Sequence, residues 1–248
     1  MAQHSQEGTR VIHRNLSLRR VGFISFSIAI FLGILLILAR AMPDLESTMY
    51  GFIKYGYPRL TSLSCPVLMT LQDREPVTVR LRNPLDKNLS YYVNAQFSSG
   101  VMISTIDQRV ELQPGETKTL SWEVGKENID LGNFIFARVF TSAASSLGMR
   151  ESTCGTFVVK LPVRGGPVIF YAILFLAVLG AAVGLLLWFR HSEMSQPDVI
   201  SQSLWMRFIA MVVAVGIMAG ILNLWFFAIL TVLLALLTTS VFLIPRKI

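Results

Sequence analysis

The chain has 248 residues, of which 53% are hydrophobic and 15% are charged, and its formal net charge is +7. Soluble domains usually carry about 25% charged residues, and the mean hydropathy here is +0.57, so the composition excludes an ordinary soluble protein. Nucleic-acid binding would require a basic patch interleaved with aromatic residues on a soluble face. The sequence has no such stretch, and we expect no nucleic-acid partner.

Apolar residues gather in three stretches, residues 21–39, 167–189 and 208–244. About 20 apolar residues cross a hydrocarbon core roughly 30 Å thick. The last stretch is too long for one crossing, and Asn223 inside it predicts a tight hairpin. The sequence therefore predicts four transmembrane helices, at residues 21–40, 167–190, 207–222 and 224–244. We interpret the first as an uncleaved anchor, because signal peptides have a shorter apolar region of roughly 7–15 residues.

Basic residues flank these stretches and set their expected orientation. The flanking residues are Arg10, Arg14, Arg19, Arg20, Arg190, Arg207, Arg246 and Lys247. Cytoplasmic segments are enriched in Lys and Arg, which predicts that the tail 1–20, the loop 191–206 and the tail 245–248 are cytoplasmic. Residues 41–166 are then extracytoplasmic, in a multi-pass protein of the plasma membrane whose first partner is the lipid bilayer.

The apolar stretches contain a pattern of small residues but no ionisable ones in the interiors of the last three predicted helices. Ion paths and proton relays use intramembrane ionisable groups, so we do not expect a pump, an ion-coupled transporter or a channel. Gly180 and Gly184 form one GxxxG motif, and Gly216 and Gly220 form another. Such spacing lets helix backbones approach closely in lipid, and we expect the second and third helices to pack through these glycines.

The middle of the chain, residues 66–162, has the pattern of short strands separated by polar turns. Strands are expected at residues 77–83, 89–97, 101–106, 108–112, 117–124, 133–141 and 155–161. In residues 133–141 either face could be buried, although Ile135, Ala137 and Val139 form the fully apolar set. Seven or eight short strands at this spacing predict an antiparallel β-sandwich.

Two turn motifs in this region carry a family resemblance. Residues 77–84 read VTVRLRNP, and residues 112–122 read LQPGETKTLSW. These segments resemble the immunoglobulin-like β-sandwich modules of secreted and cell-surface bacterial proteins, over about 50 residues of the chain. The resemblance implies a fold and a spacer or adhesive role, with no reaction. The expected fold class is thus membrane α-helical, with four transmembrane helices, plus an all-β extracytoplasmic Ig-like antiparallel sandwich.

Cys65 and Cys154 are the only cysteines, and both fall in the part expected outside the cytoplasm. Oxidising compartments permit disulfides, and we expect these two to form one, with Cys154 at the start of the last strand. Between the first apolar stretch and Cys65, residues 41–65 form a juxtamembrane helix or linker, with a helix start at Pro43. That segment could lie on the outer leaflet, contact a partner or pack under the sandwich.

The sequence contains no set of residues suited to catalysis or to binding a cofactor. All three histidines, His4, His13 and His191, lie on the expected cytoplasmic side, so we expect no metal site. The carboxylate pairs Asp107 with Glu111 and Asp73 with Glu75 are more typical of solvated strands and turns than of acid–base catalysis. We therefore expect no catalytic, cofactor-binding or metal-binding residues and no enzyme activity.

These observations favour a non-enzymatic integral membrane subunit or scaffold. It would anchor the extracytoplasmic domain and contact other membrane-protein subunits in a larger assembly, and a small-molecule ligand is not expected. The alternative is a cell-surface receptor, or a transport or secretion accessory protein, that binds a glycan or peptide through the sandwich.

Overall fold

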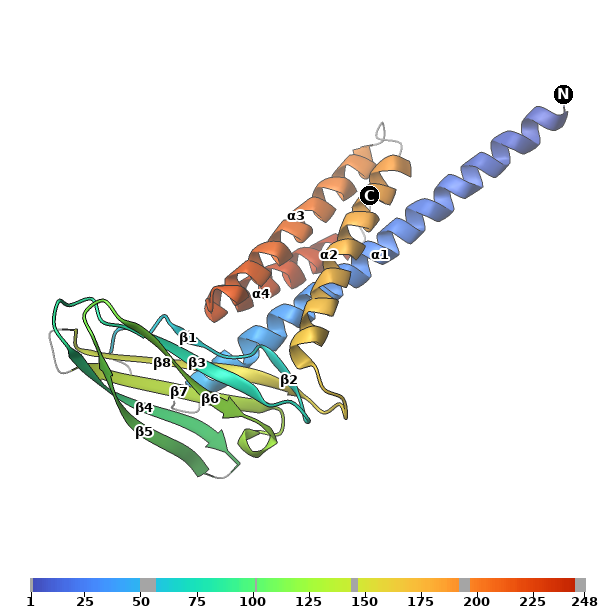
Figure 1. Cartoon of the computed structure of the whole chain (residues 1–248). Coiled ribbons are helices and arrows are strands. Elements are labelled where there is room, and N and C mark those ends of the chain that lie inside the picture. Colours follow the sequence, from blue (N-terminus) through green and yellow to red (C-terminus); the bar gives the residue numbers. More distant parts are fainter. Residues whose placement is uncertain (1, 50–56, 101, 144–146, 192–196, 244–248) are drawn as a thin grey trace. The chain divides into compact units, whose positions relative to one another are not determined.

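The computed structural model describes residues 2–49, 57–100, 102–143, 147–191 and 197–243. The chain divides into two compact units, a helical unit of Met1–Leu38 and Tyr171–Ile248 and a strand unit of Ala39–Phe170 (Figure 1). The helices are α1 (Ala2–Met49), α2 (Gly166–His191), α3 (Pro197–Ile221) and α4 (Trp225–Leu243). Two of them, α1 and α2, contribute residues to both units, so the strand unit is an insertion between helices.

The strand unit consists of two sheets. Its strands are β1 (Leu63–Ser64), β2 (Leu68–Thr70), β3 (Glu75–Arg82), β4 (Leu89–Ser99), β5 (Met102–Leu112), β6 (Thr117–Val124), β7 (Phe134–Ala143) and β8 (Met149–Val159), with one 3-10 turn, η1 (Lys126–Asn128). One sheet has the order β1-β3-β6, and the other has the order β2-β8-β7-β4-β5 (Figure 1). β5 is therefore an edge strand of the larger sheet.

The core of the strand unit lies between the two sheets because apolar residues alternate along the strands. Val77, Val79 and Leu81 of β3 are buried while the residues between them are more exposed. The larger sheet contributes alternating residues as well, and Ile135, Ala137 and Val139 of β7 belong to the same core. A period of two places successive side chains on opposite faces of a strand, so the apolar set of β7 is the set that packs in the core.

The expected fold class is wrong in its account of the strand unit. β2 pairs with β8 in parallel, with Leu68 opposite Phe157, whereas the other pairings are antiparallel. The larger sheet is therefore mixed, and the all-β antiparallel Ig-like class does not describe it. All three residues of β2 are buried, so this strand has no alternation, and a parallel pairing with a strand almost 90 residues away leaves no local signal in the sequence.

Most expected strands are present, with two differences. The two expected strands 101–106 and 108–112 correspond to one continuous strand, β5, which begins at Met102 and is paired along its length with β4, while residue 101 lies outside the described residues. The last strand begins at Met149, so Cys154 lies in its interior. The expected disulfide is confirmed: Cys65 is bonded to Cys154, and their Cα atoms are 6.1 Å apart, within the usual range for such bonds.

The expected number of membrane-spanning helices is also wrong. Within the described residues, three helical segments are long and apolar enough to cross a membrane: Leu18–Met49, Gly166–Arg190 and Ser201–Ile221. Among the residues whose side chains the structure describes, α4 contributes a shorter apolar stretch, Trp225–Ser240, about 24 Å at 1.5 Å per residue. The hairpin at Asn223 is confirmed, because Asn223 has a left-handed φ of 57°. The turn separates α3, which ends at Ile221, from α4, which begins at Trp225.

The helix expected to start at Pro43 is not separate. Pro43 lies inside α1, and the end of α1 from Ala39 belongs to the strand unit. There, Pro43 packs directly on β8, since a Cβ added to Gly155 would lie 2.4 Å from the Pro43 Cβ. Packing on the sheet therefore favours continuation of the helix through a residue that usually interrupts one. Of the expected segment 41–65, residues 50–56 lie outside the described residues.

Three of the four motif glycines, Gly180, Gly184 and Gly216, lie at helix contacts, but not at the contact expected between α2 and α3. A Cβ at Gly184 would lie 2.7 Å from the backbone nitrogen of Phe26 in α1, and one at Gly180 would lie 3.2 Å from the Ala29 Cβ. Gly216 of α3 instead faces Thr231 of α4 and Ile37 of α1. Small-residue spacing identifies faces that pack closely, but it does not identify the partner helix.

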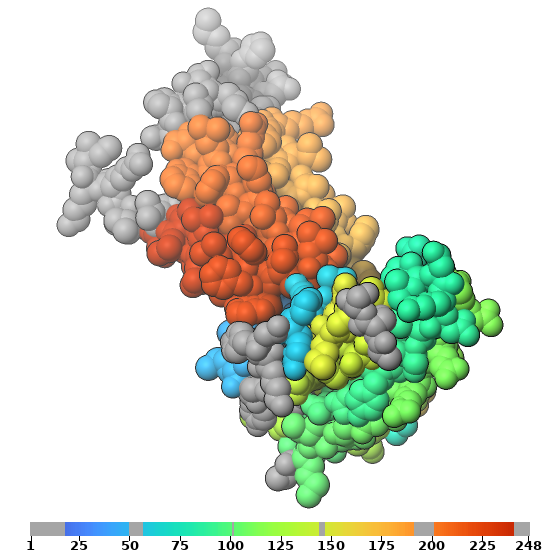
Figure 2. Space-filling model, turned by 90° about the vertical axis from the view of Figure 1, so that its left-hand side faces the viewer, coloured from blue at the N-terminus to red at the C-terminus, as the bar shows by residue number. Residues whose placement is uncertain are grey.

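Exposed apolar residues cover the outer surface of α3 and α4, the helices drawn in orange and red in Figure 2. Phe226, Leu230, Leu233 and Leu237 of α4 are all more than half exposed, and their spacing places them along one face of the helix. Arg19 lies 4.3 Å from the Trp188 ring, and Arg207 lies 4.4 Å from the Phe189 ring. An apolar surface combined with such Arg–aromatic pairs is typical of helices in lipid with an interfacial belt.

Substitution of Gly184 by Leu should destabilise the helical unit. The new side chain meets backbone atoms of α1 rather than flexible side chains, and overpacking of this kind typically costs about 1–3 kcal/mol. Thermal unfolding in detergent measures the effect. Val183→Leu is the matched control, because Val183 is exposed on the same helix. Equal melting temperatures for the two variants would contradict the close contact of α1 with α2.

Candidate binding site

A pocket with a volume of about 270 Å³ lies in the strand unit. Its lining residues come from the segment before β1, from β3 and the turn after it, and from the adjoining ends of β4, β7 and β8. They are Leu60, Thr61, Ser62, Arg80, Leu81, Arg82, Pro84, Tyr91, Thr141, Leu147, Gly148 and Arg150. Three of them are arginines and none is acidic, and we call this cavity the arginine pocket.

Alternation along β3 supplies two of the three arginines. Val79 and Leu81 are buried in the core, so Arg80 and Arg82 lie on the other face of the strand and are exposed. Residues two apart on a strand are separated by about 7 Å. β1 pairs with β3 only through Leu63 and Ser64. The end of β3 that carries the arginines is therefore paired with β6 on one side and has no strand partner on the other, where the pocket lies.

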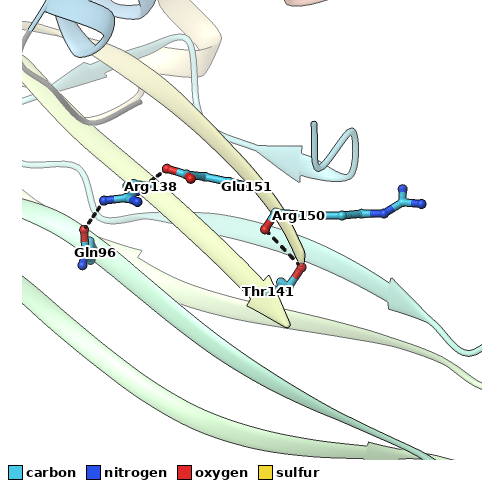
Figure 3. Close-up of polar contacts among 5 residues, drawn as sticks. All are labelled: Gln96, Arg138, Thr141, Arg150 and Glu151. Atoms are coloured by element: carbon cyan, nitrogen blue, oxygen red, sulfur yellow. Dashed lines mark hydrogen bonds and ion pairs between the residues drawn. The ribbon is translucent and has the colours of Figure 1, made fainter. Parts of the chain in front are cut away.

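The third arginine comes from β8, at the open end of the core. Arg150 is opposite Thr141 of β7, and the Thr141 hydroxyl donates to the Arg150 carbonyl oxygen at 3.4 Å (Figure 3). Tyr91 of β4 donates its hydroxyl to the Arg82 carbonyl oxygen at 3.0 Å. Burial raises the pKa of Tyr91, and the nearby charge of Arg150 partly opposes that rise. The pocket thus combines positive charge with hydroxyl groups.

A buried ion pair beside the pocket holds its wall in place. Glu151 is buried, and its carboxylate accepts from Arg138 of β7, whose guanidinium also donates to Gln96 at 3.3 Å (Figure 3). The backbone of Glu151 bonds to the segment before β1: its N–H donates to the Pro58 carbonyl, and its carbonyl accepts from Leu60 N–H. Glu151 therefore positions the residues that lead into the Leu60–Ser62 wall.

The end of α1 is fixed on the neighbouring part of β8. Asp44 is buried, and its Oδ1 accepts from the Gly155 N–H at 2.9 Å. Arg40 and Ser47 of the same helix are also buried, and the Ser47 hydroxyl donates to the Asp44 carbonyl at 2.8 Å. Asp44 and Ser47 are thus hydrogen-bonded within the strand unit, and none of these three polar residues lines the arginine pocket.

Asp73 has a structural role at the start of α2. Its carboxylate accepts from the backbone N–H groups of Thr70, Gly165 and Gly166, each at 2.8 Å. A carboxylate at a helix N-terminus satisfies donors that have no partner within the helix. Burial raises the pKa of Asp73, but the three backbone hydrogen bonds together outweigh burial and hold the pKa below its ordinary value.

The other carboxylates noted in the sequence are not assembled into an acid–base site. Asp107 of β5 accepts from Tyr92 and Asn94 of β4, and these hydrogen bonds lower the pKa of Asp107. Glu111 is exposed on β5 opposite Ser90. Within the described residues no group of three or more His, Cys, Asp or Glu is placed to hold a metal ion. The side chains of His4, His13 and His191 lie outside those described.

The arginine pocket is not evident from the sequence alone. The pattern of residues 77–82 predicts a strand that contains Arg80 and Arg82, and the excess of basic residues indicates membrane topology. The alternation VTVRLR does place both arginines on one exposed face, and that signal was available. Arg150 and Tyr91 could not be added, because only the pairing of β4, β7 and β8 brings them to the same end of the core.

Comparison with known proteins adds no functional information. No protein-family model matches the chain, and no curated protein matches it. Beta-glucuronidase 2 of Bacteroides uniformis matches 41% of this chain with 13% identity and a TM-score of 0.28, and a beta-glucosidase of Listeria innocua matches 40% with 20% identity and a TM-score of 0.27. A beta-glucosidase of Erythrobacter marinus matches 42% with 22% identity and a TM-score of 0.26. The matched regions span only 12%, 16% and 15% of those chains, and at these scores they carry no argument.

Replacement of Asp73 by Asn should destabilise the strand unit by about 1–3 kcal/mol, because charge-assisted hydrogen bonds are lost. The folded state lowers the pKa of Asp73 below 3.8. The contribution of this carboxylate is therefore fully present above pH 3.8 and is lost as the pH falls through the lower folded-state value. Thermal unfolding of wild type and variant in detergent, from pH 7 down to pH 3, measures the difference. It should shrink at low pH.

The control for this prediction is Asp86→Asn, which removes the same charge from an exposed turn. That variant should unfold at the wild-type temperature. A loss of stability in Asp73→Asn that stays constant across the pH range would contradict the role of the ionised carboxylate.

Proposed function

We propose that this protein is a non-enzymatic membrane scaffold that holds its strand unit outside the cytoplasm, where the unit contacts partner proteins. The three long apolar helical segments are compatible with a membrane protein. The Cys65–Cys154 disulfide fits an oxidising compartment. The proposed partners are other membrane-protein subunits, and the resemblance of residues 66–161 to cell-surface modules stays a prediction.

The observation that carries the partner role is the edge strand β5. It has 11 residues and is paired on one side by β4. Met102, Ile103 and Ile106 are 77%, 54% and 39% exposed, whereas Val110 and Leu112 of the same strand are buried. An exposed apolar edge strand is a template for pairing with another chain. Soluble proteins usually protect such edges, so its presence favours a partner that covers it.

The geometry of the sheets explains why this part of β5 is uncovered. The register and the strand period place Met102 and Ile106 on the same side as the buried Val110 and Leu112. The facing sheet has only three strands, β1-β3-β6, against five. An extended segment of a partner that adds to β5 would satisfy its free backbone groups and cover these apolar side chains, the usual mode of strand addition.

A second candidate function is that of a receptor or accessory protein that binds a ligand through the strand unit. The arginine pocket favours it, because convergent polar groups in a concave site are the usual basis of ligand binding. This role is compatible with the scaffold role, since β5 is not among the residues that line the pocket.

Orientation is testable with added cysteines, because both native cysteines are consumed in the disulfide. We propose that residues 41–166 are extracytoplasmic and the N-terminal tail is cytoplasmic. In sealed right-side-out vesicles, a membrane-impermeant maleimide should label Lys118→Cys directly. It should label Ser5→Cys only after permeabilisation. The reverse pattern would overturn the proposed orientation.

The partner role is testable by substitution on β5. The double variant Ile103→Lys with Ile106→Lys should lose proteins that co-purify with the wild-type chain in mild detergent, because charges on an edge strand oppose pairing. Mass spectrometry after chemical cross-linking in the native membrane measures the loss. Leu161→Lys is the control, as it adds charge at another exposed apolar residue. A wild-type chain that purifies as a monomer without any partner would contradict the scaffold role.

A further inference from the structure

The arginine pocket concentrates positive charge that the strand unit does not neutralise. Arg80, Arg82 and Arg150 line it, and no lining residue is acidic. The salt bridges within the described residues, Arg74 with Glu127 and Arg138 with Glu151, involve none of these three arginines. Three like charges around one cavity repel one another. An anion bound in the cavity would be attracted to all three arginines and would offset their mutual repulsion.

The acidic residue nearest to Arg150 in the sequence, Glu151, forms an ion pair with a different arginine. Glu151 follows Arg150 directly, but adjacent residues on a strand point to opposite faces. Figure 3 shows the result: Glu151 meets Arg138, while the Arg150 side chain extends away from that pair. The carboxylate that would neutralise Arg150 by sequence proximity is therefore held on the other side of β8.

A hydroxyl in the pocket wall also has no partner. Within the described part of the chain, Ser62 Oγ is buried and makes no hydrogen bond, and Ser62 lines the pocket. A buried hydroxyl without a partner is costly. Thr61 and Tyr91 bring further hydroxyls to the lining. Arginine guanidiniums and hydroxyl donors are the groups that hold phosphate, sulfate and carboxylate oxygens in proteins.

We propose that the arginine pocket binds a small solute through one oxyanionic group, held by Arg80, Arg82 and Arg150. The volume of about 270 Å³ lies just below the range of typical ligand pockets, so the solute is no larger than a sugar phosphate or a sugar acid. The inference goes beyond the scaffold role and does not depend on it.

The test uses the full-length protein in maltoside detergent, which has no anionic group. Inorganic phosphate, sulfate and glucuronate are titrated at constant ionic strength, with glucose as the neutral control, and binding is measured by calorimetry. At least one of the three anions should bind saturably below about 10 mM, and glucose should not. Absence of saturable binding for all three anions would overturn the proposal.

Matched variants locate the binding. Arg82→Gln and Arg150→Gln should each weaken anion affinity at least tenfold. Arg109→Gln removes the same charge from an exposed position on β5 outside the pocket and should bind as wild type. Equal losses in Arg109→Gln and Arg82→Gln would show a general charge effect and overturn the site.

Two further measurements keep the test decisive. Arg82→Lys retains the charge but not the bidentate geometry, so an intermediate affinity is expected if the glutamine variant fails to fold.

The bound group could be free in solution or part of a lipid headgroup. Repeating the phosphate titration in phosphatidylglycerol nanodiscs distinguishes these sources: competition in wild type that is absent in Arg150→Gln assigns the lipid, and unchanged affinity assigns a free solute. Partner capture through β5 stays intact in the pocket variants.

Discussion

The strand unit depends on β8 and on the polar groups buried along it. Glu151 pairs with Arg138, Cys154 is bonded to Cys65, and Gly155 contacts the end of α1. Removal of one partner from a buried ion pair costs about 3–5 kcal/mol, whereas exposed pairs contribute about 1 kcal/mol or less. β8 thus joins the edge strand β2, the central strand β7 and the segment before β1 into one body.

The sequence predicted local structure well where a strong period was present. In β3 and β6 the alternation and the turn residues locate the strands within about two residues of their observed ends, and the turn at Asn223 follows from one polar residue in an apolar stretch. The disulfide also followed from composition, because only two cysteines were available. These features depend on neighbouring residues, which a pattern can record.

What the sequence could not supply were contacts between distant segments. β2 has three buried residues and no period, so no local pattern predicts its parallel pairing with β8, and the alternation of the other strands predicts an antiparallel sheet. The GxxxG motifs marked the close-packing faces of α2 and α3 but not their partners, because Gly184 fits equally well against any helix with a small residue opposite. The continuation of α1 through Pro43 likewise depends on Gly155, which is more than 100 residues away.

The arginine pocket shows that the net charge of a segment does not reveal a local cluster of like charges. Residues 40–164 contain 14 Lys and Arg against 12 Asp and Glu, a nearly neutral total in which Arg150 and Glu151 cancel. On β8 the two point to opposite faces, so one forms a buried pair and the other borders a cavity. Local potential depends on the positions of charges rather than on their sum. A strand unit that is almost neutral overall can therefore carry a concentrated positive pocket, and the period of two in β3 and β8 is what separates the charges.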